Sequence, residues 1–193
     1  MTRSFAASTL FPYPFPQVAQ AIWFKYPNPY AEHVCSIDVL DHSICPRTGV
    51  VSVDRLISLN QNIPSWAKRL VGIGDSFFAF ERIQFHPQRN YVEMHTVNLT
   101  HRELFQMNEE ITYAPDREET RYDQAAHIQF LGLGHKPNAL VSSAVTKIED
   151  AALTRFRENA KRGRSGFMHV LKALYDCPDA SLLPRINKTG NES

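Results

Sequence analysis

The chain has 193 residues, of which 43% are hydrophobic and 11% aromatic, so it is long enough for one sizeable core but short for two ordinary domains. Its 21 basic and 20 acidic residues give a net charge of +1, so the overall field steers it toward neither nucleic acid nor membrane, and any basic patch must be local. The three cysteines are widely spaced with no Cys-x-x-Cys pair, so neither a disulfide framework nor a zinc site is expected.

The N-terminal part predicts a strand, a short helix and a hairpin. Residues 3–11 lack the long apolar stretch of a signal peptide or spanning helix, and we interpret them as a first strand rather than a transit peptide. The run QVAQAIWF is typical of a short helix that ends before Pro27. Residues 33–44 and 50–58 alternate β-branched with polar side chains, which indicates two antiparallel strands joined by a turn near Gly49.

Four more strand-like runs follow, at about residues 76–85, 91–100, 103–113 and 121–131. Turn-forming segments separate them, namely HPQRN, a tight bend near Thr100, and APDREE. This order predicts a meandering antiparallel sheet.

The hydrophobic period then changes to that of a helix. Apolar or small residues recur at spacings of three and four, at positions 144, 148, 152, 156, 160, 163, 167, 171 and 174. They predict one long amphipathic helix ending near Tyr175. Residues 176–193 are polar and proline-containing, and we expect them to form a flexible tail.

The elements together predict an α+β fold in a single domain of residues 1–175. A curved antiparallel sheet of about seven strands would grip a long C-terminal helix, with a short N-terminal helix beside it. This helix-grip architecture leaves an apolar cleft between sheet and helix, where a hydrophobic ligand commonly binds. The architecture alone does not fix the function.

One loop between the predicted strands is unusually apolar. Residues 62–74 are bounded by polar and glycine residues and contain Ile63, Pro64, Trp66, Leu70, Val71 and Ile73. Such a composition is typical of a lid that folds over a pocket or touches a membrane. The alternative is a helix packed permanently on the core.

Basic residues gather on the long helix, with six basic and one acidic residue between positions 153 and 172. Arg155, Asn159 and Arg162 are spaced by four and three, which places them along one stripe where guanidinium groups could meet a phosphate or carboxylate. A solvated basic face is the alternative. Lys25, beside the Tyr-Pro-Asn-Pro turn, is a candidate cation at the mouth of the pocket, although alone it would be read as a surface lysine.

Several short blocks, in order and at characteristic intervals, resemble the PRELI-domain family over residues 1 to 175. They occupy residues 25–29, 33–34, 37–40, 55–57, 63–66, 98–100 and 156–160. The resemblance implies a START/PITP-like helix-grip protein without catalytic activity or cofactor, which carries one glycerophospholipid between the outer and inner mitochondrial membranes. It implies location in the intermembrane space, transient membrane contact, and a heterodimer with a small helical twin-Cx9C protein.

The same resemblance assigns roles to residues already singled out. The family's basic head-group ligands map onto Lys25, Arg155 and Arg162, Asn159 lies in its Glu-Asn pattern, and residues 62–74 map onto its lid. The branch that carries phosphatidic acid usually has a lysine where this chain has Ser58 and Leu59. We therefore favour phosphatidylserine over phosphatidic acid as cargo.

Two other functional classes stay open. A hydrolase or cyclase would use cleft residues such as His95, Glu109, Glu110 or His127, although the chain has no Gly-x-Ser-x-Gly, His-Glu-x-x-His or Gly-rich phosphate loop. An interaction module would bind the small partner or a membrane surface without extracting lipid. Lipid exchange would separate it from a carrier, and a change in lipid mass would indicate an enzyme.

Overall fold

The structure is a computed structural model that describes residues 2–60, 76–131 and 139–176. Its elements, in chain order, are β1 (Thr2–Phe11), α1 (Phe15–Ala21), a 3-10 turn η1 (Ile22–Phe24), β2 (Val34–Ile44), β3 (Val51–Asn60), β4 (Ser76–His86), η2 (Pro87–Arg89), β5 (Tyr91–Asn98), β6 (Phe105–Asp116), β7 (Glu119–Phe130) and α3 (Ala139–Tyr175). The predicted strands and both predicted helices are present, with ends that differ by a few residues.

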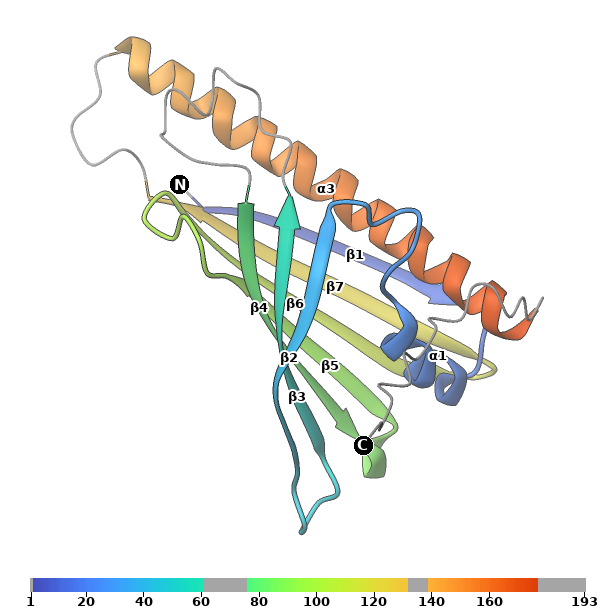
Figure 1. Cartoon of the computed structure of the whole chain (residues 1–193). Coiled ribbons are helices and arrows are strands. Elements are labelled where there is room, and N and C mark those ends of the chain that lie inside the picture. Colours follow the sequence, from blue (N-terminus) through green and yellow to red (C-terminus); the bar gives the residue numbers. More distant parts are fainter. Residues whose placement is uncertain (1, 61–75, 132–138, 177–193) are drawn as a thin grey trace, which may run out of the picture.

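One curved antiparallel sheet forms the first layer of the fold, with strand order β1-β7-β6-β5-β4-β3-β2. The second layer is the 37-residue helix α3, which runs along the inner face of the sheet, with α1 at one end (Figure 1). The predicted α+β fold, a sheet of seven strands gripping a C-terminal helix, is confirmed. Both the proposed lid and the tail beyond Asp176 lie outside the described residues.

Three turn residues have a left-handed backbone, and two of them, Gly49 and Asn90, are of types that adopt it readily. Gly49, at φ +70°, closes the β2–β3 turn, and its N–H donates to the carbonyl of Cys45 at 2.8 Å. Asn90 (φ 47°) follows η2, and Arg117 (φ 57°) lies in the two-residue link between β6 and β7. The sheet therefore reverses at the places that the turn-forming segments predict.

The Asn98–Thr100 segment, one of the blocks behind the family resemblance, braces the turn between β5 and β6. The Asn98 side-chain amide donates to the carbonyls of Thr100 and Phe105 at 2.9 and 3.0 Å. Its oxygen accepts from the Met107 N–H at 2.7 Å. Because the Asn98 side chain is buried and makes three hydrogen bonds to the backbone, its role in the fold is structural.

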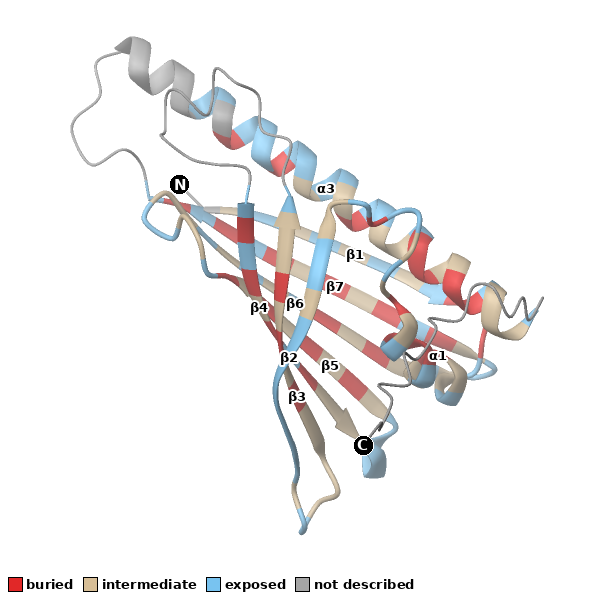
Figure 2. Cartoon of the chain, viewed as in Figure 1, coloured by how far each residue is buried: buried red, intermediate tan, exposed pale blue. Residues whose placement is uncertain are grey.

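Buried residues alternate along the strands (Figure 2), and several of them pack with Phe167 and Leu171 of α3. They form two apolar clusters. The first includes Phe11, Val18, Ile22, Ile83, Met94, Ile111, Tyr113, Tyr122, Phe167 and Leu171, and the second joins Ile128, Phe130 and Leu153 with partly buried Phe105, Met107 and Phe156.

Aromatic contacts fix α3 on the sheet. In the first cluster, the Phe167 ring centroid lies 5.3 Å from Phe11 and 5.8 Å from Tyr113, with both pairs edge-on. At the second cluster, the ring of Phe156 lies 5.6 Å from that of Phe5 in β1. The helix is thus held against the sheet at two places along its length. Within the described ranges, no helix is long and apolar enough to cross a bilayer.

Candidate functional site

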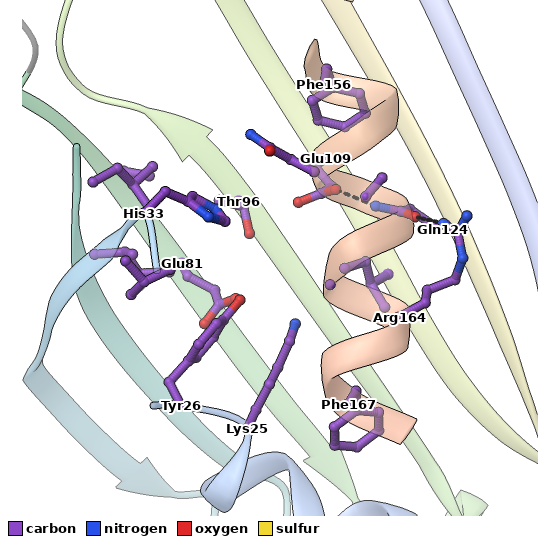
Figure 3. Close-up of a pocket in the computed structure, with 18 of the residues that line it drawn as sticks. Lys25, Tyr26, His33, Glu81, Thr96, Glu109, Gln124, Phe156, Arg164 and Phe167 are labelled. Atoms are coloured by element: carbon purple, nitrogen blue, oxygen red, sulfur yellow. Dashed lines mark hydrogen bonds between the residues drawn. The ribbon is translucent and has the colours of Figure 1, made fainter. Parts of the chain in front are cut away.

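A cavity of about 160 Å³ lies between the inner face of the sheet and α3, at the level between the two apolar clusters. Met107 and Phe156 of the second cluster line one side, and Ile111, Tyr113 and Phe167 of the first cluster line the other. The middle of the wall is polar (Figure 3), and it includes Lys25, Tyr26, His33, Glu81, Thr96, Glu109, Gln124, Asn159 and Arg164.

Four polar side chains form a row across the inner face, one from each of the strands β3 to β6. Arg55 is paired with Glu81, Glu81 with Thr96, and Thr96 with Glu109 in the strand register. All four residues lie at positions where the strand alternation points the side chain inward. Most of the other inward side chains on these strands, such as Ile57, are apolar. The sheet thus carries a polar band through an otherwise hydrophobic interior.

Arg55 and Glu81 form a buried ion pair, with side chains 6% and 5% exposed. Arg55 Nε donates to Glu81 Oε1 at 2.8 Å, and Arg55 Nη2 donates to the same oxygen. Each charge offsets the cost of burying the other, and removing either one would leave an unpaired charge in a low-dielectric interior. The Glu81 charge is therefore largely neutralised before any ligand enters.

Glu109 is held differently, because its partner is a neutral amide. Gln124 Nε2 donates to Glu109 Oε1 at 2.5 Å, and Arg164 Nη1 donates to Gln124 Oε1 at 2.8 Å. Burial raises the pKa of Glu109 above that of a free carboxyl, although the Gln124 hydrogen bond and the charge of Lys25 oppose the increase. The carboxyl is therefore easier to protonate than a surface glutamate.

Lys25 follows η1 and reaches into the cavity, where its ammonium points toward the polar band (Figure 3). Its exposed fraction is 8%, so the prediction of a mouth cation underestimated its depth. Burial alone lowers the pKa of Lys25, but Tyr26, Glu81 and Glu109 together offset burial and leave that pKa raised. Lys25 therefore remains a cation inside the protein.

The backbone around Lys25 is braced against α3. Asn28 Nδ2 donates to the Lys25 carbonyl at 2.6 Å, and Asn28 Oδ1 accepts from the Tyr30 N–H at 2.9 Å. This turn approaches the helix at Gly166, where a Cβ atom would lie 2.5 Å from Asn28 Oδ1. A glycine at this position lets the turn pack closely enough to direct Lys25 inward.

The four predicted head-group residues occupy two environments. Lys25 and Asn159 line the cavity, whereas Arg155 and Arg162 are exposed on α3 and are not among its lining residues. Arg162 lies near enough to the cavity residue His33 to lower the His33 pKa, after the larger effect of burial. The two arginines thus flank the lined face of the helix, and their role as ligands stays a prediction.

The chain also brings groups into the cavity that the sequence reasoning did not select, namely Arg164, Glu81, Gln124 and the buried Arg55 behind Glu81. The sequence did contain a signal that could have identified the residues on the strands. In β3, Arg55 falls in the same phase of the alternation as Val53 and Ile57, which marks a charge pointing into the core. The predicted lid residues, Ile63 to Ile73, lie outside the described part of the chain.

The residues named for a cleft enzyme do not converge. His95 and Glu110 face each other on the outer side of the sheet, with His95 Nδ1 3.8 Å from Glu110 Oε1. His127 is also exposed and contacts Ser4. Glu109 alone of the four lines the cavity. Among the described residues, no group of three or more His, Cys, Asp or Glu side chains is placed to hold a metal ion.

Comparison with known proteins adds a family match. The model of the PRELI-like family matches residues 16–176. A UPS-like protein of Schizosaccharomyces pombe is 32% identical over 174 residues, which cover 89% of this chain and 90% of that protein. "Protein UPS2, mitochondrial" of Saccharomyces cerevisiae is also 32% identical over 174 residues, covering 88% of this chain and 73% of its own length.

Solved structures support the architecture. A Thermus thermophilus protein superposes with a TM-score of 0.58 at 11% identity, covering 90% of this chain and 99% of its own. The Zhui aromatase/cyclase of a Streptomyces species superposes with a TM-score of 0.59 at 10% identity, and the match covers 90% of this chain and 96% of that protein. At such low identity these similarities concern the fold alone, and they agree with the helix-grip arrangement.

Proposed function

The chain belongs to the PRELI-like family, and from this premise we propose that it is a phospholipid carrier that extracts one glycerophospholipid from a membrane and releases it at another. The observation that carries the proposal is a buried ammonium, Lys25, facing a polar band inside a cavity walled by apolar clusters. Such a site matches an amphiphile with a charged head and apolar chains.

The polar band would receive the head group. Lys25 can form charge-assisted hydrogen bonds to a phosphate oxygen, and the Asn159 amide lines the same space from α3. A volume of about 160 Å³ is below the range of roughly 300 Å³ and more that is typical of sites enclosing a whole drug-sized ligand. The described residues therefore enclose room for a head group.

The acyl chains would leave the polar band along the second apolar cluster, where Met107 and Phe156 line the cavity. Each CH₂ removed from water contributes about 0.8 kcal/mol, so chain burial would supply most of the affinity. The charged groups would then supply the choice among head groups. In this division the carrier needs no covalent chemistry, and we propose that it is not an enzyme.

Phosphatidylserine is the cargo that we favour over phosphatidic acid, because Ser58 and Leu59 stand where the phosphatidic-acid branch usually has a lysine. Relatives of the chain include mitochondrial proteins of Saccharomyces cerevisiae and Homo sapiens, which supports a mitochondrial location. Because the chain resembles this family, we propose the intermembrane space as its location and a small helical twin-Cx9C protein as its partner. Co-expression with such a partner would then raise the yield of folded complex.

The test is transfer of fluorescent phosphatidylserine and phosphatidic acid, assayed separately, between donor and acceptor vesicles. The wild type should move phosphatidylserine, and Lys25→Gln should move it at least tenfold more slowly. Lys161→Gln, which removes an exposed cation from α3, should behave as the wild type. If the folded protein moves neither lipid, even with its partner, the carrier proposal is wrong and an interaction module is favoured.

A parallel measurement separates carrier from enzyme. Mass spectra of the vesicle lipids before and after incubation should contain the same species, because extraction and release change no bond. A new lipid mass that depends on the protein would contradict the proposal.

A further inference from the structure

The charges around the cavity are not those expected for a ligand that is only an anion. Lys25 points its ammonium into the cavity and Arg164 lines the wall, where it donates to Gln124, but Glu81 and Glu109 also line the wall (Figure 3). Arg55 neutralises Glu81 through the buried ion pair described above. Glu109 has no ion-pair partner among the described residues, because Gln124 stands between its carboxyl group and Arg164.

A buried carboxyl group without a paired cation is costly to keep ionised. Lys25 and Glu109 affect each other electrostatically, since the charge of Glu109 helps to raise the pKa of Lys25 and the charge of Lys25 opposes the raised pKa of Glu109. A head group with a phosphate and an ammonium could satisfy both, with the phosphate at Lys25 and the ammonium at Glu109. A head group with negative charge alone would place like charges beside each other at Glu109, which disfavours its binding.

We propose that Glu109 determines head-group specificity by accepting a hydrogen bond from a ligand ammonium, so that the cavity selects amino-phospholipids over phospholipids with purely anionic heads. This inference rests on the proposed carrier function and deepens it. Gln124 orients the carboxyl group by occupying Oε1, so that Oε2 is the oxygen left for the ligand. Arg164 acts through Gln124, whose amide it holds in the orientation that donates to Glu109.

The test compares two lipids that differ in the ammonium alone: phosphatidylserine and its deamino analogue, phosphatidyl-3-hydroxypropionate. Transfer of each between vesicles is measured for the wild type, for Glu109→Gln and for Glu110→Gln. The first substitution keeps an acceptor for Gln124 and removes the charge. The second is the matched control, because Glu110 is the next residue of β6 and faces outward toward His95.

The wild type and Glu110→Gln should transfer phosphatidylserine about tenfold faster than the deamino analogue, which corresponds to about 1.4 kcal/mol. In Glu109→Gln this ratio should fall close to one while transfer of the analogue persists. A preference that survives in Glu109→Gln, or is absent from the wild type, would overturn the proposal. Failure of the folded wild type to move either lipid would instead overturn the carrier function.

A second measurement uses the wild type alone and so does not depend on how the variant folds. The protein is incubated with vesicles containing equal amounts of the two lipids, and the bound lipid is quantified by mass spectrometry. An excess of phosphatidylserine of about tenfold is expected. Equal amounts of the two lipids would contradict a role for Glu109 in selection.

Discussion

Replacing Gly166 by alanine tests whether close packing of the Asn28 turn on α3 sets the position of Lys25. The new Cβ would lie 2.5 Å from Asn28 Oδ1, whereas ordinary contact begins at 3.4 Å, so the amide must move by about 0.9 Å. The Asn28 side chain makes two hydrogen bonds within this turn, one of them to the Lys25 carbonyl. The substitution should therefore shift Lys25 as well.

The magnitude follows from two opposing contributions to the free energy of unfolding. Alanine in place of glycine inside a helix stabilises by about 1 kcal/mol. Weakening two hydrogen bonds costs about 1 kcal/mol each. Gly166→Ala should thus lower the free energy of unfolding by about 1 kcal/mol and slow lipid transfer several-fold, because the ammonium of Lys25 is displaced.

Gly163→Ala is the control, since it lies on the same helix and its Cβ would meet no atom within 4 Å. Gly163→Ala should raise the free energy of unfolding by about 1 kcal/mol through the higher helix propensity of alanine. The free energies of unfolding of the two variants, measured in urea, should therefore differ by about 2 kcal/mol. Equal stabilisation by both substitutions would refute the packing argument. Unchanged transfer by Gly166→Ala would refute the link to Lys25.

Three further predictions concern stability and the basic face of α3. Asn98→Ala should lower the free energy of unfolding by about 2–3 kcal/mol, because three hydrogen bonds of a buried amide are lost, and urea titration would measure it. Since burial raises the pKa of Glu109, the folded state binds that proton more tightly than the unfolded chain, and wild-type stability falls as the pH rises through this raised pKa. Glu109→Gln should therefore be the more stable protein at neutral pH, with an advantage that disappears below the pKa of the unfolded carboxyl; an advantage constant across pH would contradict this. Arg155→Glu and Arg162→Glu should change the free energy of unfolding by less than about 0.5 kcal/mol, since both are exposed, yet reduce phosphatidylserine transfer. Transfer at the wild-type rate would remove them from the site.

The strands were predictable because the sheet has one face toward α3, so alternation fixes both the strands and their inward side chains. The same alternation places Arg55 beside Val53 and Ile57, but it does not say which charges meet across strands. That Arg55 lies opposite Glu81, and Thr96 opposite Glu109, depends on the register of two strand pairs, β3 with β4 and β5 with β6. The polar band is therefore a property of the assembled sheet.

For helix α3, the sequence predicted the apolar stripe but not which basic residues reach the sheet. The apolar stripe through Phe156, Ala160 and Phe167 was predicted and does face the cavity. Basic residues surround that stripe, and Arg155 is rotated by roughly 100° from its neighbour Phe156, so it is exposed beside the lined face. Arg164, on the other flank, reaches Gln124 instead. Charge spacing alone could not decide which flank contacts the sheet.

The most direct test of the carrier account is native mass spectrometry of the protein after incubation with phosphatidylserine vesicles and separation from them. The account predicts a complex of one protein with one intact phospholipid, and loss of this complex in Lys25→Gln. A protein that remains free of lipid while folded, or that binds equally well without Lys25, would contradict the central claim.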